Sequence, residues 1–168
     1  VWINGHSLGF RPNGYVSFRY DLTPYLRYGS QPNVIVVKAD NSEQPNSRWY
    51  SGSGIYRNVW LVKGNPVHVD NWGTFVHDMR ISPEEATFSL EVRIRNSSEA
   101  DRDAEISTSI YDDRNRVVTA PVTTLLRVPY TPCYDARMRE ASVDHQFSIP
   151  NPKLWSPDSP SLYTAVTE

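Results

Sequence analysis

Hydrophobic and polar positions alternate along the first third of this chain with a period of two residues, which is typical of β-strands. The alternation covers residues 15–20 and 55–62, and a dense run of β-branched residues covers 33–40. Asn-Gly pairs stand at 4–5 and 13–14, and both residue types tolerate the positive φ angles of a type I′ hairpin turn. The pattern therefore predicts strands that flank these turns.

One short helical turn is predicted between these strands, over residues 21–26. Asp21 can cap this turn, and Pro24 lies in its first residues, where a missing N–H costs little. No helix longer than one or two turns is predicted anywhere in the chain. We therefore expect an all-β protein.

The tripeptide Gly-Asn-Pro at 64–66 separates two strand-rich blocks and predicts a domain boundary. We expect a first domain over 1–64 and a second over 65–168. A hairpin tip is predicted at 112–116. Trp155 stands among prolines and is expected to help close the second domain. The second block contains strand-like segments at the spacing of a β-sandwich, and these are 67–76, 86–95, 104–111, 116–128 and 143–149.

Composition and charge narrow the classes of partner. The 168 residues include 13 prolines and 8 glycines, which suits short strands joined by many turns. The net charge is -2 and no basic stripe is present, so nucleic acid is not an expected partner. No apolar run approaches the roughly 20 residues of a membrane helix, so no membrane span is expected.

Cys133 is the only cysteine, which excludes an internal disulfide and a cluster of thiolate metal ligands. Cysteine usage therefore leaves periplasmic, secreted and cytoplasmic locations open. Asn96 begins an Asn-Ser-Ser glycosylation sequon, which matters only in a host that glycosylates proteins.

An aromatic and arginine cluster stands at the start of the segment Ser47–Leu61, where Arg48, Trp49 and Tyr50 precede a glycine-rich turn. A planar guanidinium beside two large rings suits a ligand with several hydroxyls and apolar C–H faces, as a sugar has. The alternative interpretation is that Trp49 and Tyr50 only fill the core of a sandwich.

Several longer motifs follow one another in a fixed order: VWINGHSLG, DLTPYL, NVIVVKADN, RWYSGSGIYR and LWSPDSPSLY. Together they resemble glycoside hydrolase family two, and within it most of all the β-galactosidases. The resemblance implies the C-terminal part of a galactose-binding-like jelly roll, which is a sugar-binding domain, over 1–64. It implies an immunoglobulin-like β-sandwich over 65–168, and two catalytic glutamates in a (β/α)₈ barrel that follows these domains.

No catalytic, metal-binding or cofactor-binding residues are predicted within the chain itself. A retaining glycosidase uses two carboxyl groups about 5 to 5.5 Å apart, whereas the acidic pairs at 84–85 and 112–113 suit solvated turns. The four histidines lack the close spacing of a metal site, and no serine lies in a G-x-S-x-G elbow. The glycines at 52 and 54 precede a strand rather than a helix, which argues against a phosphate cradle.

Substrate contacts are implied by the resemblance alone. In the β-galactosidases, loops of the sugar-binding domain contribute polar contacts to the galactose of the first subsite. By motif position this implies substrate binding by Asp40, Asn41, Arg48 and Trp49. An acid and an arginine that reach ring hydroxyls can orient a sugar through charge-assisted hydrogen bonds.

Two hypotheses for the function follow. The first is a non-catalytic β-domain fragment of a β-galactosidase, a retaining enzyme for terminal β-D-galactosyl residues, which shapes the sugar subsite and supports the barrel. The alternative is a freestanding carbohydrate-binding or adhesion module whose 40–50 loop binds glycans by itself. The expected partner is a β-galactoside or oligosaccharide. Because 1–62 supplies only part of a jelly roll, its strands are expected to pair in a homo-oligomer or to be poorly ordered.

Overall fold

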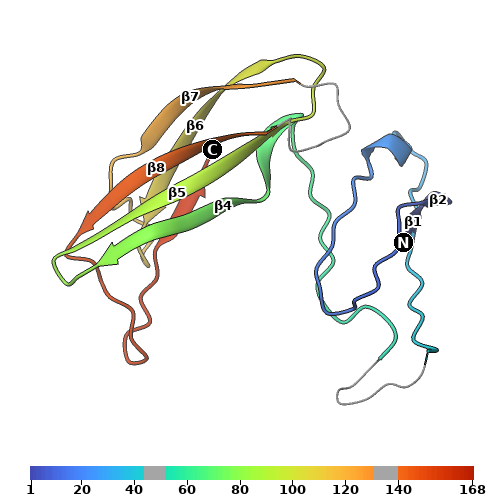
Figure 1. The fold of residues 1–168 in the computed structure, drawn as a ribbon, viewed down its shortest axis with the longest axis horizontal. Coiled ribbons are helices and arrows are strands. Elements are labelled where there is room, and N and C mark those ends of the chain that lie inside the picture. Colours follow the sequence, from blue (N-terminus) through green and yellow to red (C-terminus); the bar gives the residue numbers. More distant parts are fainter. Residues whose placement is uncertain (44–51, 131–139) are drawn as a thin grey trace. The chain divides into compact units, whose positions relative to one another are not determined.

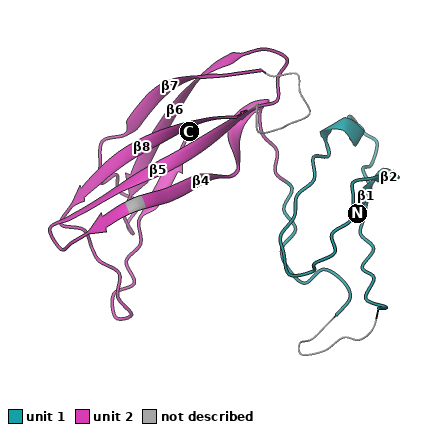
Figure 2. Ribbon diagram, in the orientation of Figure 1, with its two compact units in different colours: residues 1–61 teal, residues 62–168 magenta. Residues whose placement is uncertain are grey.

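The computed structural model describes residues 1–43, 52–130 and 140–168, apart from the side chain of Asp78. The chain divides into two compact units, residues 1–61 and 62–168, shown in teal and magenta in Figure 2. Its regular elements in the described ranges are strands and a single 3₁₀ turn. The all-β fold class predicted from the sequence is therefore confirmed, while the assignment of domains to 1–64 and 65–168 stays a prediction.

The first unit contains three short strands in one antiparallel sheet, β1 (Trp2–Ile3), β2 (His6–Ser7) and β3 (Ile35–Val36), in the order β2-β1-β3. The predicted hairpin turn joins β1 to β2, because Asn4 and Gly5 have φ angles of 50° and 85°. These are the left-handed values that a type I′ turn requires. The predicted helical turn is also present as the 3₁₀ turn Thr23–Tyr25.

Two asparagine side chains tie distant parts of the first unit together. Asn4 Nδ2 donates to the carbonyl of Tyr25 and to Asn33 Oδ1, both at 2.8 Å, and Asn4 Oδ1 accepts from Val34 N at 3.0 Å. Asn33 in turn accepts from Arg27 N and donates to Arg27 O, each at 2.8 Å. Asn4 is therefore a link between the hairpin and two loops as well as a turn residue.

The first unit forms less sheet than the sequence predicts. Residues 15–20 and 55–62 are not strands, and the predicted strand over 33–40 is reduced to β3. Asn13-Gly14 does not adopt the predicted hairpin turn, since neither residue has a positive φ. A strand forms only as part of a hydrogen-bonded ladder, and no neighbour within the described residues of this unit completes a ladder along these segments.

The second unit is a sandwich of two three-stranded antiparallel sheets (Figure 1). One sheet has the order β4-β5-β8 and the other has the order β7-β6-β9. All five strand segments predicted in this region contain a strand, although the segment 116–128 supplies only its second half. The bounds are β4 Val67–Ile81, β5 Glu85–Asn96, β6 Arg102–Tyr111, β7 Val122–Val128, β8 Glu140–Pro150 and β9 Thr164–Thr167.

The core of the second unit lies between its two sheets and follows the alternation of the sequence. Every second residue of β5 and β8 points inward, which is the two-residue period of a half-buried strand. The buried apolar cluster consists of Leu90, Val92, Ile94, Ile106, Ile110, Val128, Val143, Phe147 and Ile149. The outward residues of β4, β5 and β8 form the second surface of that sheet, called the outer face below.

Strand β4 departs from regular pairing with β5 at two places, between Val69 and Thr74 and between His77 and Arg80. At the first irregularity Trp72 has a φ of 55°, an uncommon value for a bulky residue. The next residue must be glycine, because a Cβ on Gly73 would lie 2.6 Å from the carbonyl oxygen of Asp70. A larger residue would force the two backbones apart.

Three features of the second unit differ from the sequence-based expectations. Asp112 is buried rather than solvated, because its carboxylate accepts bonds from Arg114 N and from the backbone and guanidinium of Arg116 at 2.7 to 2.9 Å. Trp155 is 60% exposed and does not fill the core. The sequon residue Asn96 is fully buried. Within the described ranges, no helix has the length and apolar character needed to cross a membrane.

Candidate functional site

The structure places Asp40 and Asn41 together at the end of the segment that follows β3, and it leaves Arg48 and Trp49 outside the described residues. Asp40 is exposed and Asn41 is half-buried. Whether the four predicted substrate-binding residues share one site therefore stays a prediction. The same holds for Tyr50 and for most of the 40–50 loop.

Asp40 is an ionised carboxylate held by its own loop. Ser42 Oγ donates to Asp40 Oδ1 at 2.6 Å and Lys38 Nζ lies 3.0 Å from Asp40 Oδ2. These partners, the Ser42 hydroxyl foremost, lower the pKa of Asp40 to about 2. A carboxylate has about four acceptor positions, so these two contacts and the bond from Ser42 N at 3.3 Å leave room for another donor such as a sugar hydroxyl.

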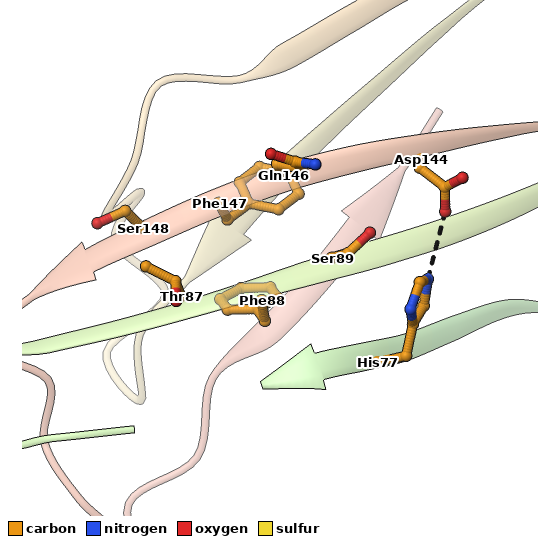
Figure 3. A pocket seen from close by; sticks show the side chains of 8 residues that line it. All are labelled: His77, Thr87, Phe88, Ser89, Asp144, Gln146, Phe147 and Ser148. Atoms are coloured by element: carbon orange, nitrogen blue, oxygen red, sulfur yellow. Dashed lines mark hydrogen bonds and ion pairs between the residues drawn. The ribbon is translucent and has the colours of Figure 1, made fainter. Parts of the chain in front are cut away.

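A second candidate site lies on the outer face of the β4-β5-β8 sheet, where side chains from all three strands surround a hollow of about 570 Å³ (Figure 3). His77 comes from β4, directly opposite Ser89 of β5, and Ser89 is opposite Gln146 of β8. Directly opposed residues of a sheet share a face and lie close together. The hollow is lined by His77, Thr87, Phe88, Ser89, Asp144, Gln146, Phe147 and Ser148. Of these, Phe88 and Phe147 pack their rings in the core between the sheets.

The imidazole of His77 is held in place by two neighbours. His77 Nε2 lies 3.3 Å from Asp144 Oδ1, the contact drawn as a dashed line in Figure 3. On its own strand the ring stacks with Phe75 at a centroid distance of 5.8 Å and an interplanar angle of 16°. Phe75 is itself 59% exposed. A histidine and a phenylalanine ring thus form one platform at the rim of the hollow.

The side chains of this hollow can be compared with those of catalytic sites. In a nucleophilic triad the imidazole bonds to a hydroxyl or thiol on one side and to a carboxylate on the other. The contacts of His77 include one with a carboxylate, that of Asp144, and a ring stack with Phe75. In the described part of the chain no group of three His, Cys, Asp or Glu side chains could hold a metal ion.

Sequence reasoning missed the outer face because its members are far apart in the chain. His77 and Asp144 are separated by 67 positions, and histidine spacing alone gave no sign of their contact. The available signal was the alternation of polar residues along 85–95 and 140–148. That signal identifies an outward face, but it does not say which two strands lie beside each other.

Another histidine is structural. His145 is 1% exposed and faces the core from β8. Its Nδ1 is 2.9 Å from Thr108 Oγ1 and its Nε2 is 3.2 Å from Thr124 Oγ1, so it links the two sheets. Burial lowers the pKa of His145 because it penalises the charged imidazolium.

The amide of Asn96 has no free atom for glycan attachment in the folded chain. Its Nδ2 donates to the carbonyls of Ala100 and Val128 at 2.8 and 3.1 Å, and its Oδ1 accepts from Ser98 N and Oγ at 2.9 and 2.6 Å. The predicted sequon is therefore a buried turn element of the folded unit.

Comparison with known proteins assigns the chain to a family. The model of the family described as "Glycosyl hydrolases family 2" matches residues 74–168. The β-galactosidase BoGH2A of Bacteroides ovatus is 43% identical over 169 residues, which cover 100% of this chain and 19% of that protein. A putative β-glucuronidase of Formosa agariphila is 34% identical over 168 residues, covering 100% of this chain and 14% of that protein.

Solved structures of a family 2 member and of a β-glycosidase are also similar to this chain. A glycosyl hydrolase family 2 member from Bacteroides cellulosilyticus aligns over 99% of this chain and 22% of its own, with a TM-score of 0.78 and 29% identity. A β-glycosidase from Bacteroides vulgatus aligns over 99% of this chain and 19% of its own, with a TM-score of 0.73 and 33% identity. The chain thus spans between 14% and 22% of the length of these four proteins.

Proposed function

This chain belongs to glycosyl hydrolase family 2, and from that premise we propose that it is the non-catalytic β-domain part of a β-galactosidase. In this proposal the parent enzyme removes terminal β-D-galactosyl residues with retention, using two carboxyl groups of a separate barrel domain. The chain supplies loop residues to the sugar subsite and supports the barrel. Its substrate is a β-galactoside.

The observation that carries the proposal is the 43% identity to a β-galactosidase over the whole of this chain. The aligned region covers the whole chain, so it spans the 40–50 loop as well as the sandwich. Asp40 adds a chemical reason, because its lowered pKa keeps it an acceptor for sugar hydroxyls at any pH well above about 2. Galactose has hydroxyl donors and no charge, so a carboxylate acceptor suits it.

A second candidate is a β-glucuronidase, and the 34% identity to a putative β-glucuronidase over the whole chain favours it. The two substrates differ at two positions, since a glucuronide carries a carboxylate where a galactoside carries a hydroxymethyl, and its 4-hydroxyl is equatorial where that of a galactoside is axial. Recognition of that carboxylate requires a cationic partner, for which arginine is well suited. Arg48 of the predicted loop is the obvious residue to test.

The deciding experiment is an assay of the full-length parent enzyme against matched chromogenic β-galactoside and β-glucuronide substrates. We expect turnover of the galactoside, and preferential turnover of the glucuronide would replace the first proposal with the second. The isolated chain should hydrolyse neither substrate. Turnover that co-purifies with the folded chain and is lost on mutation of one of its residues would contradict a non-catalytic role.

An Arg48→Ala substitution in the parent sharpens the assignment of the loop. If Arg48 makes a desolvated bond to the sugar, the substitution should lower kcat/KM, and the loss should correspond to about 1.5 to 3 kcal/mol of transition-state stabilisation. The stability of the fold should change little. Arg127→Ala is the matched control, because Arg127 lies in the second unit and pairs with Asp101 at the surface. Unchanged kinetics of the Arg48 variant would support a purely structural role for Arg48.

A further inference from the structure

We propose that the outer face of the β4-β5-β8 sheet carries a second sugar-binding site, separate from the 40–50 loop, and that its ligand is a neutral oligosaccharide. The site is built on the ring pair Phe75 and His77 and on the polar side chains of Ser89, Asp144 and Gln146. It goes beyond the proposed function, because it requires binding of a longer glycan by the second unit itself.

The first observation is the backbone of β4. Pairing with β5 is regular from Thr74 to His77 and is interrupted on both sides of this run. Bulges redirect side chains and are over-represented beside functional sites. At the first interruption, Trp72 has a positive φ and Gly73 has no space for a side chain. The strand thus fixes the position of the segment that bears Phe75 and His77.

The second observation is the ring platform. Phe75 is 59% exposed, although the face around it is largely polar. It stacks with His77, and His77 is held by Asp144 at 3.3 Å. An exposed ring in a fixed orientation can pack against the apolar C–H face of a sugar. Because the two rings are already oriented in the free chain, binding loses less conformational entropy.

The third observation is the chemistry of the hollow beside the rings. Its hydroxyl and amide groups, from Thr87, Ser89, Gln146 and Ser148, each both donate and accept hydrogen bonds. Figure 3 shows them along two neighbouring strands, with Ser89 and Gln146 close to Asp144. Sugar hydroxyls have the same double capacity. The hollow, at about 570 Å³, falls within the range for small-ligand sites.

The carboxylates near the ring platform favour a neutral glycan over an anionic one at that end of the hollow. Asp144 lies at the hollow, and Glu85 accepts a bond from Ser148 Oγ at 2.6 Å beside it. The nearby Arg93 is directed to the carbonyl of Trp72 at 3.3 Å and toward Glu91 at 3.8 Å. A uronate, sulfate or phosphate beside the ring platform would therefore meet a carboxylate, whereas the cationic Arg80 lies opposite Thr87 at the other end of the hollow. A protein partner is also disfavoured, since the centre of a protein interface is typically depleted of charged residues.

The test is a titration of the ¹⁵N-labelled chain with β-1,4-linked galactotetraose, followed by amide chemical shifts. We expect saturable shifts confined to residues 75–77, 87–91 and 144–148. Phe75→Ala should weaken binding about tenfold, and Gln146→Ala should weaken it less. Phe10→Ala is the matched control, because Phe10 is 84% exposed and lies in the first unit. It should bind as the unchanged chain does.

Three results would overturn the proposal. These are the absence of saturable shifts, shifts confined to residues 38–43, and equal binding of an oligoglucuronide. Shifts at the same residues that grow with protein concentration in the absence of sugar would instead identify an interface between copies. If Phe75→Ala fails to fold, Gln146→Ala and Phe75→Tyr replace it in the test. Phe75→Tyr preserves the ring and should bind normally, whereas Gln146→Ala should bind more weakly. Failure here leaves the enzymatic assay of the parent unaffected.

Discussion

The two compact units have similar strand-rich sequences but very different interiors. The second unit buries a continuous apolar cluster between two sheets, whereas Ile3 is the one buried hydrophobic residue among the described residues of the first unit. In the first unit large apolar side chains are exposed instead, such as Trp60 at 78% and Leu61 at 80%. Strand propensity therefore yields a core only where a second layer exists to receive the apolar face.

This contrast bears on the expected homo-oligomer. Many of the exposed apolar residues of the first unit lie in segments that form no ladder within the described chain, and unpaired segments of this kind favour association. Self-association through the first unit remains a prediction, which light scattering at micromolar concentration can test.

The largest expected effect is the loss of a core side chain in the second unit. Leu90 is 2% exposed, so Leu90→Ala should lower the free energy of unfolding by about 2 to 5 kcal/mol through lost burial and a cavity. Leu125→Ala, at a site 77% exposed in the same unit, should change it by less than about 0.5 kcal/mol. Urea denaturation of the second unit measures both.

Leu61→Ala extends the same comparison to the first unit, where Leu61 is 80% exposed. Its effect in a monomeric sample should also be small. A loss as large as that of Leu90→Ala would show that Leu61 is buried in solution, and the contrast between the two units would then be wrong.

A smaller loss is expected at the bulge of β4. Gly73→Ala places a Cβ 2.6 Å from Asp70 O and 2.8 Å from Arg93 O, both of them backbone atoms that cannot swing aside. The variant should lose about 1 to 3 kcal/mol of stability through overpacking. Gly64→Ala is the matched control, because its Cβ would make only an ordinary contact of 3.5 Å with His68. Equal stabilities for these two variants would contradict the close packing at Gly73.

The smallest effect is a pH dependence of the second unit. His145 has a lowered pKa in the folded chain, while 6.5 is the ordinary value, so the unfolded chain binds the proton more readily. Stability should thus fall as the pH drops from about 8 to about 5. Asp112, with a pKa lowered to about 2, loses its contribution only below about pH 4, where unfolded aspartate is protonated.

His145→Gln removes the titrating group while keeping hydrogen-bonding atoms near Thr108 and Thr124. The variant should have a flatter stability profile over the same pH range, measured by urea denaturation at each pH. A decline as steep as that of the unchanged chain would assign the pH dependence to other groups.

Local sequence signals predicted the parts of the fold that depend on neighbours in the chain. Asn4-Gly5 forms its hairpin turn, the 3₁₀ turn contains Pro24, and the tip at 112–116 joins its flanking segments. In each case the residues fix their own backbone through φ preferences or short-range hydrogen bonds. The prediction failed at 15–20 and 55–62, where the pattern favours strands but a ladder depends on a distant partner.

The same distinction between local sequence signals and long-range pairing applies to the candidate sites. Motif order indicated the 40–50 loop, and the structure describes Asp40 and Asn41 of it. The contact of His77 with Asp144, and the links from His145 to Thr108 and Thr124, join residues that no local pattern connects. Their positions depend on which strands are neighbours and in what register.

The sequence by itself determined the all-β class, the turns at 4–5, 23–25 and 112–116, the inward alternation of the sandwich strands and the family, because these depend on short-range periodicity and motif order. Only the tertiary structure decided that Asn96 and Asp112 are buried, that Trp155 is exposed, and that His77 faces Asp144 across the sheet. The contact of His77 with Asp144 depends on pairing between strands far apart in the chain. A shift of one residue in the register of β4 or β8 would turn one of these two side chains to the opposite face.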